Sequence, residues 1–266
     1  MSGGWLKVVG LGPGPEDWLT PEARRDLAEA TDLVGYFPYV DRVPPGPQVR
    51  HASDNRVELD RARFALDLAA GGRRVAVVSG GDPGIFAMAA AIFEALDDPS
   101  APAAWHAVPL AVDPGVSAMQ AAAARAGAPL GHDFCAISLS DNLKPWDVVL
   151  KRLRLAAEAD FVIALYNPIS RARPWQLGAA FDALRDLRAP ETPIVLGRAV
   201  GRPDEALTVT TLGAVEPSQA DMRTLVIIGA SHTRLVPRAD GGTPWVYTPP
   251  AITGGEGCCR LFSPRI

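Results

Sequence analysis

The residues best placed to do chemistry in this sequence lie in short loops, each of which follows the end of a predicted buried strand. Glycine lets a ligand approach the main chain closely, and free amide and carbonyl groups can then bind a polar small molecule. Each loop taken alone is an ordinary turn. Together they predict a site that holds its ligand largely through main-chain groups. The four loops are Gly12-Pro13-Gly14, Gly80-Gly81-Asp82-Pro83, Pro114-Gly115-Val116-Ser117 and Tyr166-Asn167-Pro168.

Familiar catalytic arrangements are missing from the sequence. It contains no His-x-x-x-His pair or Cys/His cluster for a catalytic metal, no Walker A lysine loop and no Gly-x-Ser-x-Gly elbow. The cysteines Cys135, Cys258 and Cys259 form neither a disulfide framework nor a four-cysteine metal site. We therefore expect no bound metal, and a reaction that transfers a group from an already activated cofactor.

The first glycine loop invites comparison with a dinucleotide-binding fingerprint. That fingerprint places its third glycine one residue later than Gly14 and needs an acidic residue at the far end of the second strand. Asp32 has about the right separation, but it precedes the strand Leu33–Tyr36. The pattern argues against a nicotinamide site.

The elements that position these loops alternate between strand and helix in the first half of the chain. This order predicts a mainly parallel sheet with helices on both faces. The carboxyl ends of parallel strands meet at one edge, so the loops should converge there. The expected strands are Leu6–Leu11, Leu33–Tyr36, Val75–Ser79 and Trp105–Leu110, and the expected helices begin near Pro21, Arg56, Ile85 and Ala118.

A second unit is expected after the hinge Ala128-Pro129-Leu130-Gly131. Its predicted strands are 134–139, 161–165, 194–200, 207–211 and 225–228, and its predicted helices are 146–157 and 175–187. After Val236 the sequence loses periodicity and becomes rich in glycine and proline. We therefore expect an N-terminal α/β domain over 1–127, a C-terminal α/β domain over 128–237 and an irregular tail over 238–266.

The composition is that of a soluble globular protein, with 48% hydrophobic and 21% charged residues in 266. A net charge of -4 argues against nucleic acid as the main partner. No apolar run is long enough to span a membrane, and the start of the chain lacks the apolar core of a secretory signal. We expect a cytoplasmic protein.

The order of the loop motifs resembles that of the tetrapyrrole (corrin/porphyrin) methyltransferases that use S-adenosylmethionine, over about Leu6 to Ala230. Within that family, the stretches Ser53-Asp54-Asn55-Arg56 and His132 to Trp146 are similar to those of enzymes acting on precorrin-3B in cobalamin biosynthesis. The resemblance implies two α/β domains with a cofactor cleft between them, usually in a homodimer. It also implies methylation at C17 of precorrin-3B, coupled to ring contraction that gives precorrin-4.

The resemblance also implies the cofactor site. Asp82 could instead stabilise its own turn as an Asx residue, and Ile85 and Phe86 could belong to the core. The implied S-adenosylmethionine contacts are Pro13, Gly80, Gly81, Asp82, Ile85, Phe86, Ser117, Ala118, Tyr166, Asn167, Val200 and Thr224.

Ring contraction moves protons, so an acid or base should lie near the macrocycle. Asp17, Ser138 and Asp141 are candidates, and each could equally be a cap or turn residue. Relatives usually have an aspartate directly after Gly-Pro-Gly, where this chain has Pro15. The carboxylates of the substrate call for basic side chains, and each candidate could also be solvated surface charge. These candidates are Arg50, Arg56, Lys144, Arg171 and Arg173.

Three other functions compete with this one. The same fold could methylate a cobalt-containing corrinoid, or it could methylate a protein or an RNA. From a different class, the chain could bind a tetrapyrrole without catalysis.

Overall fold

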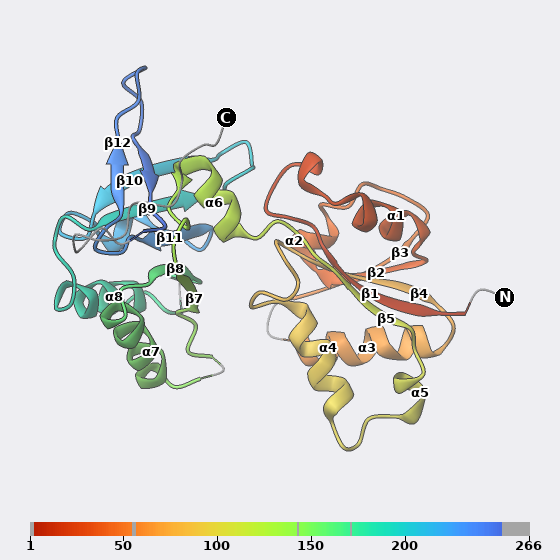
Figure 1. Ribbon diagram of the computed structural model, residues 1–266. Coiled ribbons are helices and arrows are strands. Elements are labelled where there is room, and N and C mark those ends of the chain that lie inside the picture. The colour runs from red at the N-terminus through yellow and green to blue at the C-terminus, as the bar shows by residue number, and fades with distance from the viewer. Residues whose placement is uncertain (1–2, 55–56, 143, 171, 252–266) are drawn as a thin grey trace, which may run out of the picture. The chain divides into compact units, whose positions relative to one another are not determined.

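The computed structural model describes residues 3–54, 57–142, 144–170 and 172–251. The chain forms two compact units (Figure 1). Unit 1 comprises residues 1–121 and 199–206, and unit 2 comprises residues 122–198 and 207–266. The division falls inside helix α6 (Ala118–Ala126), a few residues before the predicted break after residue 127, and the short segment 199–206 returns to unit 1.

Unit 1 is built on a five-stranded sheet with the order β3-β2-β4-β1-β5. All four strand pairs are parallel, as the sequence predicts. The central strand β4 is buried on both faces, because Val75, Ala76, Val77 and Val78 are all fully buried. The strands are β1 (Trp5–Gly10), β2 (Asp32–Tyr36), β3 (Val49–Ser53), β4 (Arg74–Ser79) and β5 (Leu110–Asp113).

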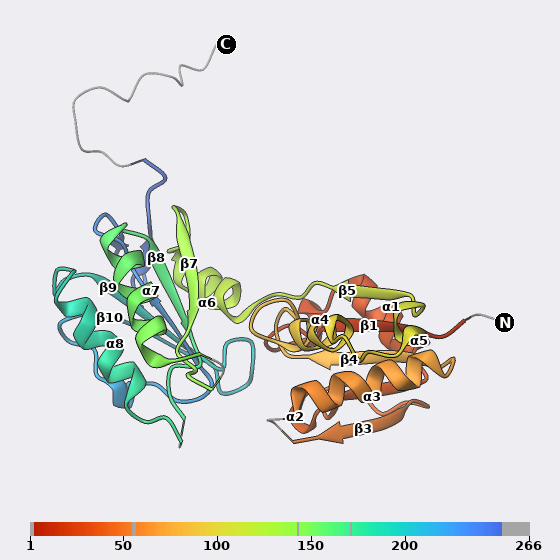
Figure 2. The ribbon, with the colours of Figure 1, turned by 90° about the horizontal axis from the view of Figure 1, so that it is seen from below.

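Helices cover both faces of this sheet, with α3 and α4 on one side and α1 on the other (Figures 1 and 2). Val75 and Val77 pack toward α3 and α4, whereas Ala76 and Val78 pack with Leu27 of α1. This alternation follows from the two-residue period of a strand. The helical segments are η1 (Glu16–Trp18), α1 (Pro21–Glu29), α2 (Phe37–Val40), α3 (Glu58–Ala70), α4 (Met88–Asp97) and α5 (Ala103–His106).

One predicted strand of unit 1 is wrong. Residues 105 and 106 of the expected strand Trp105–Leu110 belong to the short helix α5 (Ala103–His106), and β5 begins only at Leu110. The Trp105 indole is buried and its Nε1 donates a hydrogen bond to Asp67 Oδ1 at 2.8 Å. The apolar residues of this segment favour a strand, but the packing of Trp105 against α3 determines that it is helical instead.

Unit 2 contains a second five-stranded sheet, in the order β10-β9-β11-β8-β7. Strands β7 and β8 are parallel, whereas β11 is antiparallel to both β8 and β9. Helices α7 and α8 lie side by side and pack on the core of this sheet, around Leu153 and Phe181 (Figures 1 and 2). The elements are β7 (Phe134–Ser138), α7 (Trp146–Glu158), β8 (Val162–Tyr166), α8 (Gln176–Arg185), β9 (Pro193–Arg198), β10 (Ala206–Thr211), η2 (Pro217–Gln219) and β11 (Thr224–Ile228).

A small third sheet corrects the expectation of an irregular tail. Strand β13 (Trp245–Tyr247) lies within 238–266 and pairs with β12 (Arg234–Val236) and β6 (Gly127–Ala128). The Arg238 guanidinium stacks on the Trp245 ring at 3.5 Å. Cys258 and Cys259 lie outside the described residues. Within the described ranges, no helix combines the length and the apolar character needed to cross a bilayer.

Candidate functional site

Two glycine loops of unit 1 are joined directly through their main chains. Gly12 donates to Gly81 O at 3.1 Å, and Gly81 donates to Gly12 O at 2.9 Å. Both residues have positive φ, 63° and 70°, which glycine adopts without strain. The loops after β1 and β4 therefore form one connected main-chain surface, as their shared position at the carboxyl ends of parallel strands predicts.

Asp82 connects the second loop to the third. Its Oδ1 accepts a hydrogen bond from Gly84 N at 2.8 Å, and its Oδ2 accepts one from Gly115 N at 3.1 Å. A Cβ on Gly115 would lie 2.3 Å from Gly81 O, so only glycine allows this approach. Both oxygens of Asp82 accept hydrogen bonds from main-chain amides, as expected if Asp82 stabilises its own turn. Contact between Asp82 and a cofactor stays a prediction.

The third loop ends in a helix cap. Ser117 is buried, and its Oγ accepts a hydrogen bond from Gln120 N at 3.2 Å while Gln120 Oε1 accepts one from Ser117 N at 3.0 Å. A Cβ built on Gly81 would stand 3.9 Å from Ala118 N and from Ser117 Cα, an ordinary contact distance. Gly81, Ser117 and Ala118 thus lie close together, so the structure brings three predicted cofactor contacts to one place.

Phe86 does not belong to the core. Its side chain is 51% exposed and its φ is 51°, a left-handed conformation that is unfavourable for a bulky side chain. Ile85 is half-buried, and its amide donates to Asp82 O at 3.3 Å. The core alternative is therefore wrong for Phe86. An exposed aromatic ring in a strained conformation beside Asp82 supports, but does not test, the predicted cofactor contact.

Two arginines that sequence reasoning missed hold the first glycine loop. The Arg42 guanidinium donates to Leu11 O and Gly12 O at 2.9 Å and to Gly14 O at 3.2 Å. Arg202 Nε donates to Pro13 O at 3.1 Å. Burial lowers the pKa of Arg42, and the nearby charge of Arg202 lowers it further. Spacing gives no signal for either residue, because both reach the loop from distant segments.

Val200 belongs to the same segment as Arg202, and this segment lies against the first glycine loop. Val200 is buried in unit 1, next to Ala199, which has a φ of 48°. A Cβ on Gly14 would lie 2.1 Å from Gly201 O, so the segment lies directly against the first glycine loop. The two predicted cofactor contacts Pro13 and Val200 therefore lie in neighbouring segments of unit 1.

Two other predicted residues of unit 1, Asp17 and Arg50, make no hydrogen bond to the glycine loops among those that the structure describes. Asp17 is exposed within η1. Arg50 donates to the carbonyl oxygens of Val40, Val43 and Pro44 at 2.6–2.8 Å, so its guanidinium stabilises a loop. This favours a structural role for Arg50 over the predicted contact with substrate carboxylates.

In unit 2 the predicted residues gather where β7 and β8 end. Ser138 is buried, and its Oγ accepts a hydrogen bond from Asn167 Nδ2 at 2.9 Å. Ser138 and Tyr166 are direct partners in the parallel pair β7–β8, and Asn167 has a φ of 52°. A predicted catalytic residue and two predicted cofactor contacts thus share this edge.

The remaining candidates of unit 2 are more scattered. Asp141 Oδ2 accepts a hydrogen bond from Gln176 Nε2 at 3.2 Å, whereas Thr224 is buried at the start of β11 and bonds Asp221. Lys144 and Arg173 are half-buried in the loops that precede α7 and α8. Arg56 and Arg171 lie outside the described residues, so their predicted roles stay predictions.

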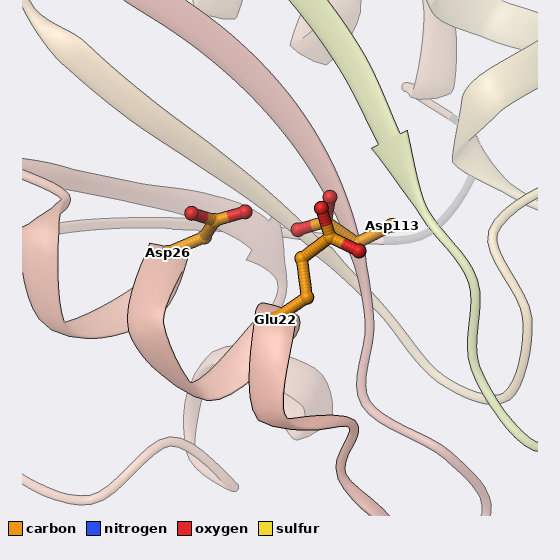
Figure 3. Close-up of side chains that lie close together, drawn as sticks. All are labelled: Glu22, Asp26 and Asp113. Atoms are coloured by element: carbon orange, nitrogen blue, oxygen red, sulfur yellow. The ribbon is translucent and has the colours of Figure 1, made fainter.

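A cluster of three carboxylates, of which Asp26 and Asp113 are buried and Glu22 is exposed, includes the residue that directly precedes the third glycine loop (Figure 3). Glu22 and Asp26 of α1 and Asp113 at the end of β5 each place an oxygen within 4.8 Å of the others. Lys7 Nζ bonds Asp26 Oδ1 at 2.6 Å. Burial raises the pKa of Asp113 to about 7, and the neighbouring carboxyl groups of Asp26 and Glu22 add to this effect. Asp113 therefore keeps its proton to much higher pH than an exposed aspartate.

The model of the Tetrapyrrole (Corrin/Porphyrin) Methylases matches residues 6–216 of this chain. The chain belongs to that family. It is 60% identical over 254 residues to a precorrin-3B C(17)-methyltransferase of a Sinorhizobium species, covering 95% of this chain and 99% of the relative.

Solved structures of the family agree with this assignment. The crystal structure of the methyltransferase CobJ superposes with a TM-score of 0.87 at 53% identity, covering 92% of this chain and 100% of that one. A uroporphyrin-III C-methyltransferase from Thermus thermophilus, complexed with S-adenosyl homocysteine, superposes with a TM-score of 0.65 at 25% identity. This match covers 85% of this chain and 97% of the other. The family resemblance and the two-domain α/β fold expected from the sequence are confirmed.

Proposed function

We propose that this protein methylates C17 of precorrin-3B with S-adenosylmethionine, in a reaction coupled to ring contraction that yields precorrin-4, during cobalamin biosynthesis. The observation that carries the proposal is the connected surface of three glycine loops in unit 1. It occurs in a chain that matches a precorrin-3B methyltransferase over nearly its whole length. No catalytic metal or protein nucleophile is needed for this reaction.

The cofactor would supply a methyl group on a sulfonium, and an electron-rich carbon of the macrocycle can attack it. The residues of this chain would bind and orient the reactants and exclude water. The close approach of Gly81 to Ser117 and Ala118 supports a cofactor site there, because the atoms nearest to Gly81 are main-chain atoms and no bulky side chain stands among them. Pro13, Gly80, Asp82, Ile85, Phe86 and Val200 would complete the unit 1 contacts, and Tyr166, Asn167 and Thr224 would contribute from unit 2.

Ser138 is the best supported of the proton-transfer candidates. Its oxygen accepts hydrogen bonds from the Asn167 side-chain amide and from the Ser140 main chain, so its hydroxyl hydrogen would be the group that donates to a substrate atom. Asp141 is bound to Gln176, and Asp17 is exposed. If Ser138 moves a proton during ring contraction, S138A should lower kcat by about 100-fold or more with little change in KM. A loss of less than about five-fold with lowered thermal stability would show that the hydroxyl only fixes Asn167.

The proposal includes a cytoplasmic homodimer whose small-molecule partner is a tetrapyrrole. Sedimentation equilibrium of the purified chain would test the dimer, since a monomer at micromolar concentration would contradict it.

Incubation with precorrin-3B and methyl-labelled S-adenosylmethionine tests the function itself. We expect one labelled methyl group in the product and the absorption spectrum of a ring-contracted corrinoid. Methylation of the cobalt-containing substrate alone would shift the assignment to that branch. Binding of both compounds without transfer would support the non-catalytic alternative.

A further inference from the structure

A pair of tryptophans stands where α7 and α8 begin. Trp146 is the first residue of α7 and Trp175 directly precedes α8, and their ring centroids are 5.0 Å apart with the planes at 77°. Both helices follow strands of the parallel pair β7–β8, which places their starts at the edge that carries Ser138 and Asn167. The pair therefore belongs to the edge of unit 2 where the predicted site residues lie.

The two rings are buried to different extents. Trp146 packs against the hydrophobic core of unit 2, whereas Trp175 is 49% exposed. The Trp175 side chain makes no capping hydrogen bond to α8. Trp146 thus fixes the orientation of Trp175 through an edge-to-face contact, and a large aromatic surface of Trp175 remains open. A surface held in this way loses little entropy when a flat ligand stacks on it.

Two cationic residues lie close in the sequence to the two tryptophans. Arg173 is two residues before Trp175, and a main-chain bridge with Ser170 fixes its backbone, with N–O distances of 3.1 and 3.0 Å. Among the residues that the structure describes, Arg173 Nη1 is buried and has no hydrogen-bond partner. Lys144 is two residues before Trp146, and burial lowers its pKa, with a smaller contribution from Arg152.

The two carboxylates nearest in the sequence accept hydrogen bonds from other groups. Asp141 binds the Gln176 side chain, and Asp147 accepts a hydrogen bond from the main chain of Val148. The Oε1 atom of Gln176, in a side chain that is 99% buried, has no hydrogen-bond partner in the described part of the chain. Arg173 and Gln176, which flank Trp175 in the sequence, thus each leave one buried polar atom without a partner among the described residues.

We propose that Trp175, positioned by Trp146, stacks on the face of the tetrapyrrole macrocycle while Arg173 and Lys144 bind its carboxylates. This inference rests on the proposed function for the identity of the physiological substrate. A largely flat ring bearing several carboxylates matches an aromatic side chain with cationic residues nearby in the sequence, and the planar guanidinium of Arg173 can bind a carboxylate with two hydrogen bonds.

The test measures binding of uroporphyrin III, a stable flat macrocycle with eight carboxylates, to the full chain by porphyrin absorption. W175A should weaken binding by about ten-fold, and W175F should restore most of it, since phenylalanine also presents a flat ring. R173Q should weaken binding by about ten-fold and also reduce its salt dependence, whereas W175A should leave the salt dependence unchanged. W245F is the control, because Trp245 is an exposed tryptophan of the same unit that stacks on Arg238 instead.

Two readouts separate this inference from the proposed function. Affinity for S-adenosylmethionine should be unchanged in W175A and R173Q, while KM for precorrin-3B rises about ten-fold in each. Unaltered porphyrin affinity in W175A, or absence of porphyrin binding to the wild type, would overturn the proposed subsite. Failure of the wild type to methylate precorrin-3B would overturn the proposed function alone, and the porphyrin measurement would still decide the subsite.

Discussion

The two units offer different chemistry at the carboxyl ends of their parallel strands. In unit 1 three loops interlock through main-chain atoms, and glycine is required where the loops approach one another. In unit 2 the corresponding edge carries side chains: a serine bound to an asparagine, two tryptophans and two cations. The first edge is suited to a small polar molecule held by amides and carbonyls, and the second to a flat ring with charged substituents.

This difference teaches where sequence motifs are informative. Close main-chain packing leaves glycines at fixed places, which any reader of the sequence can recognise. An aromatic and cationic surface leaves no such signature, because tryptophan and arginine occur for many reasons. Mutations that affect one edge and spare the other will test whether the division is real.

The largest effect is expected from G115A. Its Cβ would lie 2.3 Å from Gly81 O, so the second and third loops must separate. We expect about a 100-fold loss of activity from the displaced loops, with roughly 1–3 kcal/mol less stability. G178A in α8 is the matched control, because its Cβ meets only Pro217 Cγ at 3.5 Å. The free energy of unfolding of G178A should rise by up to about 1 kcal/mol. An equal loss of activity and stability in both variants would contradict the interlocking of the loops.

A smaller effect is expected from R42Q. It removes the guanidinium that binds three carbonyl oxygens of the first glycine loop. Denaturant unfolding should show a loss of roughly 2 kcal/mol, and calorimetry should show weaker binding of S-adenosylmethionine but unchanged binding of uroporphyrin III. R24Q provides the comparison, since the Arg24–Glu16 pair is exposed and should contribute less than about 1 kcal/mol. If R42Q and R24Q show the same stability and the same affinity for S-adenosylmethionine, Arg42 does not support the cofactor site.

The smallest effect is expected on the pH dependence of stability, through Asp113. Asp113 has a pKa of about 7 in the folded protein, above its ordinary value of 3.8, so the folded state holds more protons than the unfolded state between these values. Stability from this group must therefore fall as pH rises from about 4 to 7. D113N, which leaves Lys7, Glu22, Asp26 and Glu29 in place, should be more stable than the wild type at pH 8 by roughly 1–2 kcal/mol. Parallel pH profiles of unfolding free energy would refute the assignment.

Much of unit 1 could be predicted from sequence. The run Val75–Val78 marks a strand buried on both faces, and Thr20 with Pro21 marks the start of α1, where Thr20 Oγ1 accepts the amide of Ala23 at 3.1 Å. Residues 105–109 were wrongly predicted as strand, since the contact of Trp105 with Asp67 joins residues 38 positions apart. Strand β13 was missed for a similar reason: three residues become a strand only by pairing with β6 and β12.

The candidate site shows the same limit. The sequence by itself determined the family, the parallel order of the first sheet and the places where main chains must approach closely, because glycine spacing and strand periodicity are local properties. Only the tertiary structure decided that Asp82 joins two loops, that Arg42 and Arg202 hold a third, and that Trp146 contacts Trp175. Each of these contacts joins side chains to segments that only folding brings together, and no local pattern records such a partner.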